Sequence, residues 1–93
     1  MSDKDVLYAQ AILGRDALDF MRSELGQTML GIATQEAADA MDALKTVSTW
    51  RRRKIQELQA RVWRAESFHA WLIDLAHAGE SAEQALEAQE IDD

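Results

Sequence analysis

Apolar residues recur in steps of three and four along most of this 93-residue chain, which is the spacing of one face of an α-helix. Residue types that lose little freedom in a helix dominate the composition, and the β-branched and aromatic types favoured in strands are sparse. The sequence therefore predicts an all-α fold. Without cysteine for a disulfide or proline for a rigid loop, only long helices and oligomerisation remain to reinforce so small a domain.

The same pattern predicts three helices, over about residues 3–13, 16–45 and 50–78, in one helical domain of residues 1–79. Beyond this domain, residues 80–93 are acidic and contain few large apolar side chains. This segment is expected to be either a short helix or a frayed, solvated tail.

Glycines and hydroxyl side chains suggest where these helices end. Gly14 weakens any continuation of the first helix, and Gly79 occupies the place of a residue just past a helix end, where a left-handed conformation is needed. Gly26 and Gly31 either end a helix near residue 26 or lie within a continuous helix, which the unbroken apolar phase favours. Hydroxyl and β-branched side chains at residues 46–49 favour a turn.

A turn at residues 46–49 predicts an antiparallel helical hairpin with a short N-terminal helix. The apolar stripes are too wide for two helices to cover, so self-association into a helical bundle is the natural completion. The rival is one long rod that pairs as a coiled coil, but it would place Arg51 on the apolar seam. The predicted interface residues are Leu25, Met29, Ile55, Leu58, Val62, Trp63, Phe68, Trp71 and Leu72.

Charge is distributed unevenly, although the chain as a whole carries a net charge of −7. Residues 45–64 hold seven positive side chains and one negative, whereas residues 65–93 hold eight negative side chains and none positive. A cluster of like charges is either a binding surface or the complement of an oppositely charged surface in the same assembly.

The basic segment raises nucleic-acid binding as an alternative function. Its candidate contacts are Trp50, Arg51, Arg52, Arg53, Lys54, Arg61 and Arg64. Cations at a helix start oppose the helix dipole, so they do not stabilise the helix locally. Against this alternative, the overall acidic charge is unusual for a nucleic-acid-binding domain, and the acidic tail of a neighbouring subunit could neutralise the cations instead.

Metal binding is a more distant alternative, and no catalytic site is predicted. Glu66 and His69 have the Glu-x-x-His spacing by which a helix presents two metal ligands, and they are weak candidates. No cysteine nucleophile and no glycine-rich phosphate loop occur, so neither enzymatic activity nor a cofactor is expected.

A further set of residues resembles a known group. The set comprises Ser23, Glu24, Leu25 and Gly26, then Ala33, Glu36, Ala40 and Leu44, then Ile55, Leu58 and Gln59, and finally Trp71, Leu72 and Gly79. Together they resemble small helical proteins encoded in tailed bacteriophages and prophages, often near genes for head assembly and DNA packaging. The resemblance implies a helical hairpin and a virus-related role, and it carries no catalytic residue over.

The expected function is accordingly a non-enzymatic, homo-oligomeric interaction module, in the context of phage assembly or packaging. The first residues carry mixed charges and do not read as a signal peptide, and no stretch is long and apolar enough to span a bilayer. No membrane association is expected, and the predicted location is the bacterial cytoplasm, or the virion for a structural phage protein.

Overall fold

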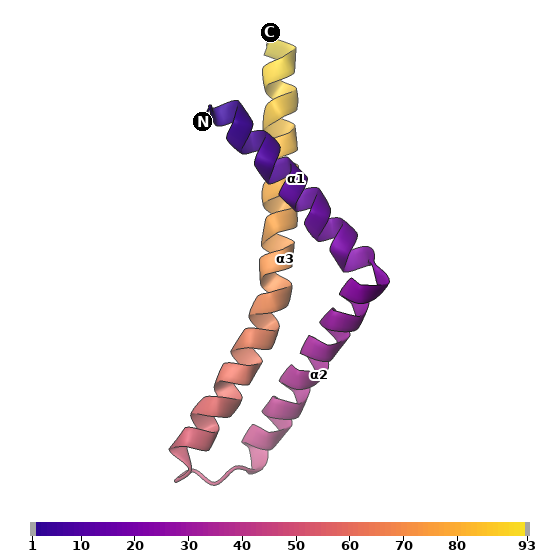
Figure 1. Cartoon of the computed structure of the whole chain (residues 1–93). Helices are drawn as coiled ribbons and strands as arrows, with labels where there is room; N and C mark the ends of the chain where they lie inside the picture. The colour runs from indigo at the N-terminus through magenta and orange to yellow at the C-terminus, as the bar shows by residue number, and fades with distance from the viewer. Residues whose placement is uncertain (1, 93) are drawn as a thin grey trace. The chain divides into compact units, whose positions relative to one another are not determined.

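The computed structural model describes the backbone of residues 2–92 and the side chains of residues 2–90. These residues form three helices and no strand: α1 (Asp3–Arg22), α2 (Glu24–Thr46) and α3 (Arg52–Asp92) (Figure 1). The all-α prediction is confirmed. The helices group into two compact units, one made of the described residues of Met1–Ser23 and Trp71–Asp93, and the other made of Glu24–Ala70.

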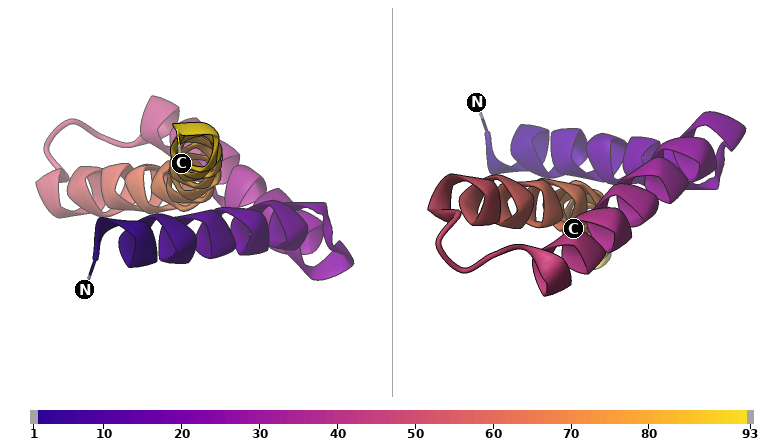
Figure 2. Two further views of the ribbon diagram at one scale, coloured as in Figure 1. Left: turned by 90° about the horizontal axis from the view of Figure 1, so that it is seen from above. Right: turned by 90° about the horizontal axis from the view of Figure 1, so that it is seen from below.

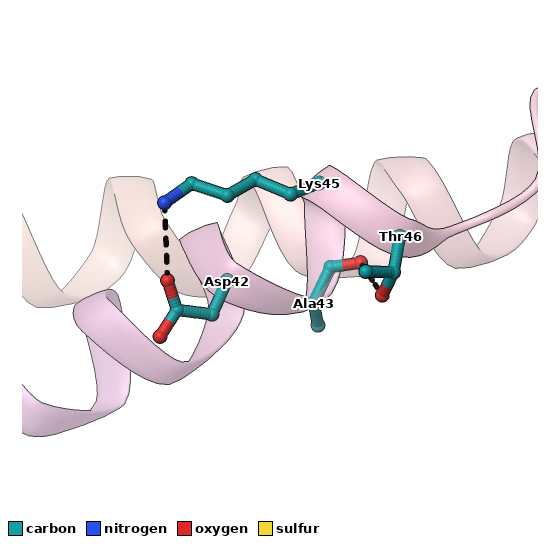
Figure 3. Close-up of polar contacts among 4 residues, drawn as sticks. All are labelled: Asp42, Ala43, Lys45 and Thr46. Carbon is teal, nitrogen blue, oxygen red and sulfur yellow. Dashed lines mark hydrogen bonds and ion pairs between the residues drawn. The ribbon is translucent and has the colours of Figure 1, made fainter.

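The second of these, the hairpin unit, consists of α2 and the N-terminal part of α3 running antiparallel on either side of a loop at residues 47–51 (Figure 1). The loop follows the predicted turn by one or two residues and excludes the rival uninterrupted rod. At the end of α2, Lys45 Nζ lies 3.3 Å from Asp42 Oδ1, and Thr46 Oγ1 donates a hydrogen bond to the Ala43 carbonyl (Figure 3). Beyond the loop, the Ile55 amide donates to the Arg51 carbonyl and so begins the hydrogen-bond ladder of α3.

Small side chains on α2 form one wall of the core of this hairpin unit. Ala40 and Leu58 are each only 2% exposed, and Ala65, about two turns beyond Leu58 on α3, is also buried. Ala37 and Ala33, one and two turns before Ala40, are half-buried. An alanine face of this kind lets two helices approach closely, but it buries little apolar area for each residue.

In the other unit, the crossed unit, α1 crosses the C-terminal part of α3 (Figures 1 and 2). The contact consists of small residues at every third position, which are all buried: Ala11, Gly14 and Ala17 on α1, and Ala76, Gly79 and Ala82 on α3. A Cβ atom placed on Gly14 would lie 2.6 Å from Gly79 Cα, and a Cβ on Gly79 would lie equally close to Gly14 Cα. The two backbones therefore touch at these glycines.

This crossing corrects the predicted end of the first helix at residue 13. Helix α1 continues through Gly14 to Arg22, because the glycine that weakens the helix locally is the residue that admits α3. The interruption comes instead at Ser23, whose φ of −69° and ψ of 159° are extended, and whose amide is bonded to the carbonyls of Asp19 and Phe20.

The predicted helix over residues 16–45 is therefore divided, but not at its glycines. The break at Ser23 precedes Gly26, and both Gly26 and Gly31 lie within α2. A Cβ atom on Gly31 would meet nothing within 4 Å. No backbone approaches this glycine, so close packing does not explain its presence.

The predicted helix end at Gly79 is also wrong. No glycine among residues 2–92 has a positive φ, and α3 continues through Gly79 to Asp92. Residues 80–92 are thus part of a long helix, and only Asp93 of the predicted tail lies outside the described residues. Ala82 and Leu86 are buried in the crossed unit, and the Arg15 guanidinium lies 2.7 Å from Glu83 Oε1. These contacts supply the packing that the sequence of this segment seemed to lack.

Replacing Gly14 by alanine should test the crossing. The new Cβ must force the helices apart, and overpacking of this kind costs about 1 to 3 kcal/mol, offset in part by the better helix propensity of alanine. We expect a net loss of about 1 to 2 kcal/mol in the free energy of unfolding, measured by urea denaturation at one fixed protein concentration.

Gly31→Ala is the matched control, because it makes the same chemical change in a helix with open space around the new methyl group. It should raise the free energy of unfolding by about 0.5 to 1 kcal/mol. Equal effects of the two substitutions would contradict the backbone contact at Gly14.

Candidate interaction surfaces

The hairpin unit exposes a row of large apolar side chains on α2, which we call the outer stripe. Leu25, Met29 and Ile32 are 63%, 39% and 61% exposed, and their spacing places them on one side of the helix. A shallow groove beside this stripe is lined by Met29, Ile32 and Glu36 of α2 and by Arg64 and Phe68 of α3. The outer stripe is therefore accessible to another molecule.

The predicted interface residues occupy three different environments. Leu58 is buried in the hairpin core and has almost no surface left for a partner. Leu25, Met29, Trp63 and Trp71 are exposed, and the remainder are half-buried: Ile55, Val62, Phe68 and Leu72. The part of the predicted α3 stripe centred on Leu58 thus serves contact within the chain, and the exposed members remain candidates for contact between chains.

Sequence reasoning missed the exposed apolar residues of α1. Tyr8, Ile12 and Leu13 are 46%, 60% and 52% exposed. The buried side of α1 consists of Ala11, Gly14 and Ala17 instead. Recurrence of alanine and glycine at every third position was the signal that could have identified this face.

The hairpin ends in a basic tip, which we define as residues 50–54 of the loop and the first turn of α3. Trp50 is 81% exposed, and Arg51, Arg52 and Arg53 are exposed beside it. These residues and the half-buried Lys54 line one shallow concavity. The first turn of α3 contains no acidic residue, so nothing in it offsets these charges.

Ion pairs neutralise only part of the basic segment. Glu57 Oε2 lies 3.8 Å from Lys54 Nζ, and its Oε1 lies 3.1 Å from Arg61 Nη2. Arg51, Arg52 and Arg53 have no ion pair with any of the residues whose side chains are described. The tip therefore presents three uncompensated positive charges around an exposed indole.

The seven candidate nucleic-acid contacts line three different hollows of the hairpin unit. Residues 50–54 make up the tip, whereas Arg61 and Arg64 lie about two and about three helical turns beyond Lys54 on α3. Arg61 lines a hollow with Glu36 and Asp39 of α2, and Arg64 lines the groove beside the outer stripe. Of these three places, the tip is where an exposed indole lies beside three arginines that form no ion pair with the described residues.

Glu66 and His69, the weak metal candidates, both line another groove of the hairpin unit, together with Ala33, Ala37 and Met41. Both side chains are exposed. Over the part of the chain that the structure describes, no group of three histidine, cysteine, aspartate or glutamate side chains is placed to hold a metal ion.

The crossed unit contains a groove next to the helix crossing. It is lined by Leu18 and Met21 of α1, by Ile73 and His77 of α3, and by the bonded pair Arg15 and Glu83. The hydrogen bond from Arg15 to the Glu83 carboxylate, reinforced by the attraction between their charges, raises the pKa of Arg15 above its ordinary value. The ion pair of Arg15 with Glu83 thus joins α1 to α3.

No protein-family model, curated protein or solved structure matches this chain. The resemblance to phage and prophage proteins stays a prediction. Among the described residues, no helix combines the length and the apolar character that crossing a bilayer requires.

Leu58→Ala and Leu25→Ala make the same chemical change at a buried and at an exposed position. Leu58→Ala should lower the free energy of unfolding by about 2 to 5 kcal/mol, because it opens a cavity in the hairpin core. Leu25→Ala should change it by no more than about 0.5 kcal/mol.

Both variants are best measured by tryptophan fluorescence during urea denaturation, at concentrations low enough to dissociate any assembly. A loss at Leu25 as large as the loss at Leu58 would mean that the chain itself covers the outer stripe.

Proposed function

We propose that this chain is a non-enzymatic helical module that acts by associating with further copies of itself. The observation that carries this proposal is a reversal of the usual burial pattern. Of the eight buried apolar side chains in the described residues, six are alanine, and the leucines Leu58 and Leu86 complete the set. Twelve large apolar side chains are exposed over the same residues.

Energetics favour a second molecule as the cover for this surface. Burial of apolar area stabilises by about 25 cal/mol for each Å² removed from water. A chain of this length gains little from burying alanines, and it has no disulfide to compensate. Association would bury the large side chains that the chain leaves in water, and would thereby add the apolar stabilisation that its own core lacks.

The outer stripe of α2 is the best-defined part of the proposed association surface. Leu25, Met29 and Ile32 form a continuous row, and the half-buried Phe68 lies in the groove beside them. Fully buried apolar clusters surrounded by charged residues are typical of interface centres. Glu36 and Arg64, which line the same groove, provide such a charged rim.

The biological setting that we propose is phage or prophage assembly, in which the chain would be an assembly or packaging accessory. Support for this setting comes from the resemblance of residues 14–79 to small helical phage proteins. Self-association can be tested independently of this setting.

Sedimentation equilibrium at micromolar concentration tests the proposal directly. We expect a mass that is a multiple of the 10.5 kDa of one chain. Leu25→Glu combined with Ile32→Glu should raise the dissociation constant at least about 100-fold, because it places two charges in the centre of an apolar contact.

Gln10→Glu combined with Gln59→Glu is the control, because it adds the same charge at exposed positions outside the outer stripe and away from both charged ends of α3. This control should associate as the unmodified chain does. A folded 10.5 kDa monomer at micromolar concentration would refute self-association.

A further inference from the structure

Apolar association does not account for the basic tip. Trp50 is the most exposed of the large apolar side chains described, and the three arginines that follow it have no ion pair among the described residues. Positive charge at the start of a helix is unfavourable, because it meets the positive end of the helix dipole. The sequence thus maintains a locally unfavourable cluster, which indicates a partner that carries negative charge.

The other end of α3 has the opposite charge. Glu80, Glu87 and Glu90 are exposed, and no Lys or Arg among the described residues pairs with them. Glu83 differs, because Arg15 already holds it. The last turn of α3 contains no basic residue, so its carboxylates are also on the unfavourable side of the helix dipole. We call residues 80–90 the acidic end.

We infer that the basic tip of one copy binds the acidic end of α3 in a second copy. This inference rests on the proposed self-association and specifies one of its contacts. Tip and acidic end belong to opposite ends of the same helix, so each copy offers one of each. A contact between unlike surfaces of identical chains is head-to-tail, and it repeats into a ring or a chain of subunits.

The chemistry of both surfaces suits this pairing. The carboxylates of Glu80, Glu87 and Glu90 match the guanidinium groups of residues 51–53 in number and in charge, and arginine binds carboxylates through two parallel hydrogen bonds. Among these acids, Ala88 is exposed and offers a small apolar surface to an indole. Tryptophan and arginine are also the residues that contribute most to protein interfaces.

Nucleic acid is the competing occupant of the tip, and the charge of the chain argues against it. A net charge of −7, with eight acidic residues between positions 65 and 93, repels a polyanion. In contrast, a second copy would place its acidic end against the basic tip. The positive charge of the tip would then offset the repulsion that the acidic ends of two copies exert on each other. The observations therefore favour a protein carboxylate cluster as the partner.

A charge-swap experiment tests the contact between copies. The tip variant carries Arg51→Glu, Arg52→Glu and Arg53→Glu, and the end variant carries Glu80→Lys, Glu87→Lys and Glu90→Lys. All six positions are exposed, and none forms an ion pair within the described residues, so both variants should keep the helical circular dichroism of the unmodified chain.

Each variant alone brings like charges together at the contact. Its association, measured by sedimentation at low salt, should weaken about tenfold or more, and it should become stronger as salt rises, because salt screens the repulsion. An equimolar mixture restores opposite charges at every contact, because each variant then meets the complementary surface of the other. The mixture should regain the affinity of the unmodified chain.

Separate outcomes would overturn the two proposals. If both variants associate as tightly as the unmodified chain, or if the mixture gains nothing, the tip does not bind the acidic end, and self-association through the apolar surfaces still stands. If the unmodified chain is a monomer at every salt concentration, self-association fails as well.

Fluorescence titration with single-stranded DNA and RNA at low salt tests the competing occupant. Binding that the tip variant loses, together with a mixture that does not restore association, would assign the tip to nucleic acid and overturn the contact between copies. No binding to either nucleic acid is the result that we expect.

Discussion

Close approach of helix backbones, which glycine permits, is the constraint on which the crossed unit depends, and the core of the hairpin unit likewise contains small side chains. In the crossed unit, Gly14 and Gly79 bring α1 and α3 into backbone contact, and alanines flank the crossing on both helices. In the hairpin unit, Ala40 is as deeply buried as Leu58, each being 2% exposed. Small residues allow many van der Waals contacts between backbones, but helices that lie so close together leave no room for large side chains between them. The large apolar side chains therefore lie outside the core, and this arrangement leaves them for a partner.

The sequence predicted the helical content and the loop after α2 well, because both depend on local preferences. Residues 46–49 favour a turn through their own side chains, and a loop follows at residues 47–51. Glycine is ambiguous by comparison. It suits a helix end because it adopts left-handed conformations, and it suits a helix crossing because it has no Cβ. At Gly14, the role is decided by Gly79, which is 65 positions away in the sequence. A pattern of neighbouring residues contains no information about this contact.

Apolar periodicity identifies which side of a helix is apolar, but not what covers that side. Leu25 and Leu58 both belong to stripes with the same spacing, yet one is 63% exposed and the other 2%. The difference comes from the residues that face each leucine. Leu58 is buried in the hairpin core, whereas the outer stripe lies beside the alanine face of α2 and remains exposed. Candidate interface residues could thus be selected by type from the sequence, and sorted into core and surface only with the structure. Similarly, the sequence grouped Arg61 and Arg64 with the tip, although they line other parts of the hairpin.

Apolar and charged surfaces would contribute differently to an assembly of this chain. Apolar contact supplies affinity but tolerates several orientations, because the outer stripe is a simple row of aliphatic side chains. Charge complementarity supplies orientation, because a positive surface that meets a negative one excludes the arrangements in which like charges meet. This role in orientation gives a physical reason for the unfavourable charges at both ends of α3. Each of these charge clusters slightly destabilises α3. Together they would select one direction of contact, where a helical protein with an alanine core and an apolar surface could otherwise form many.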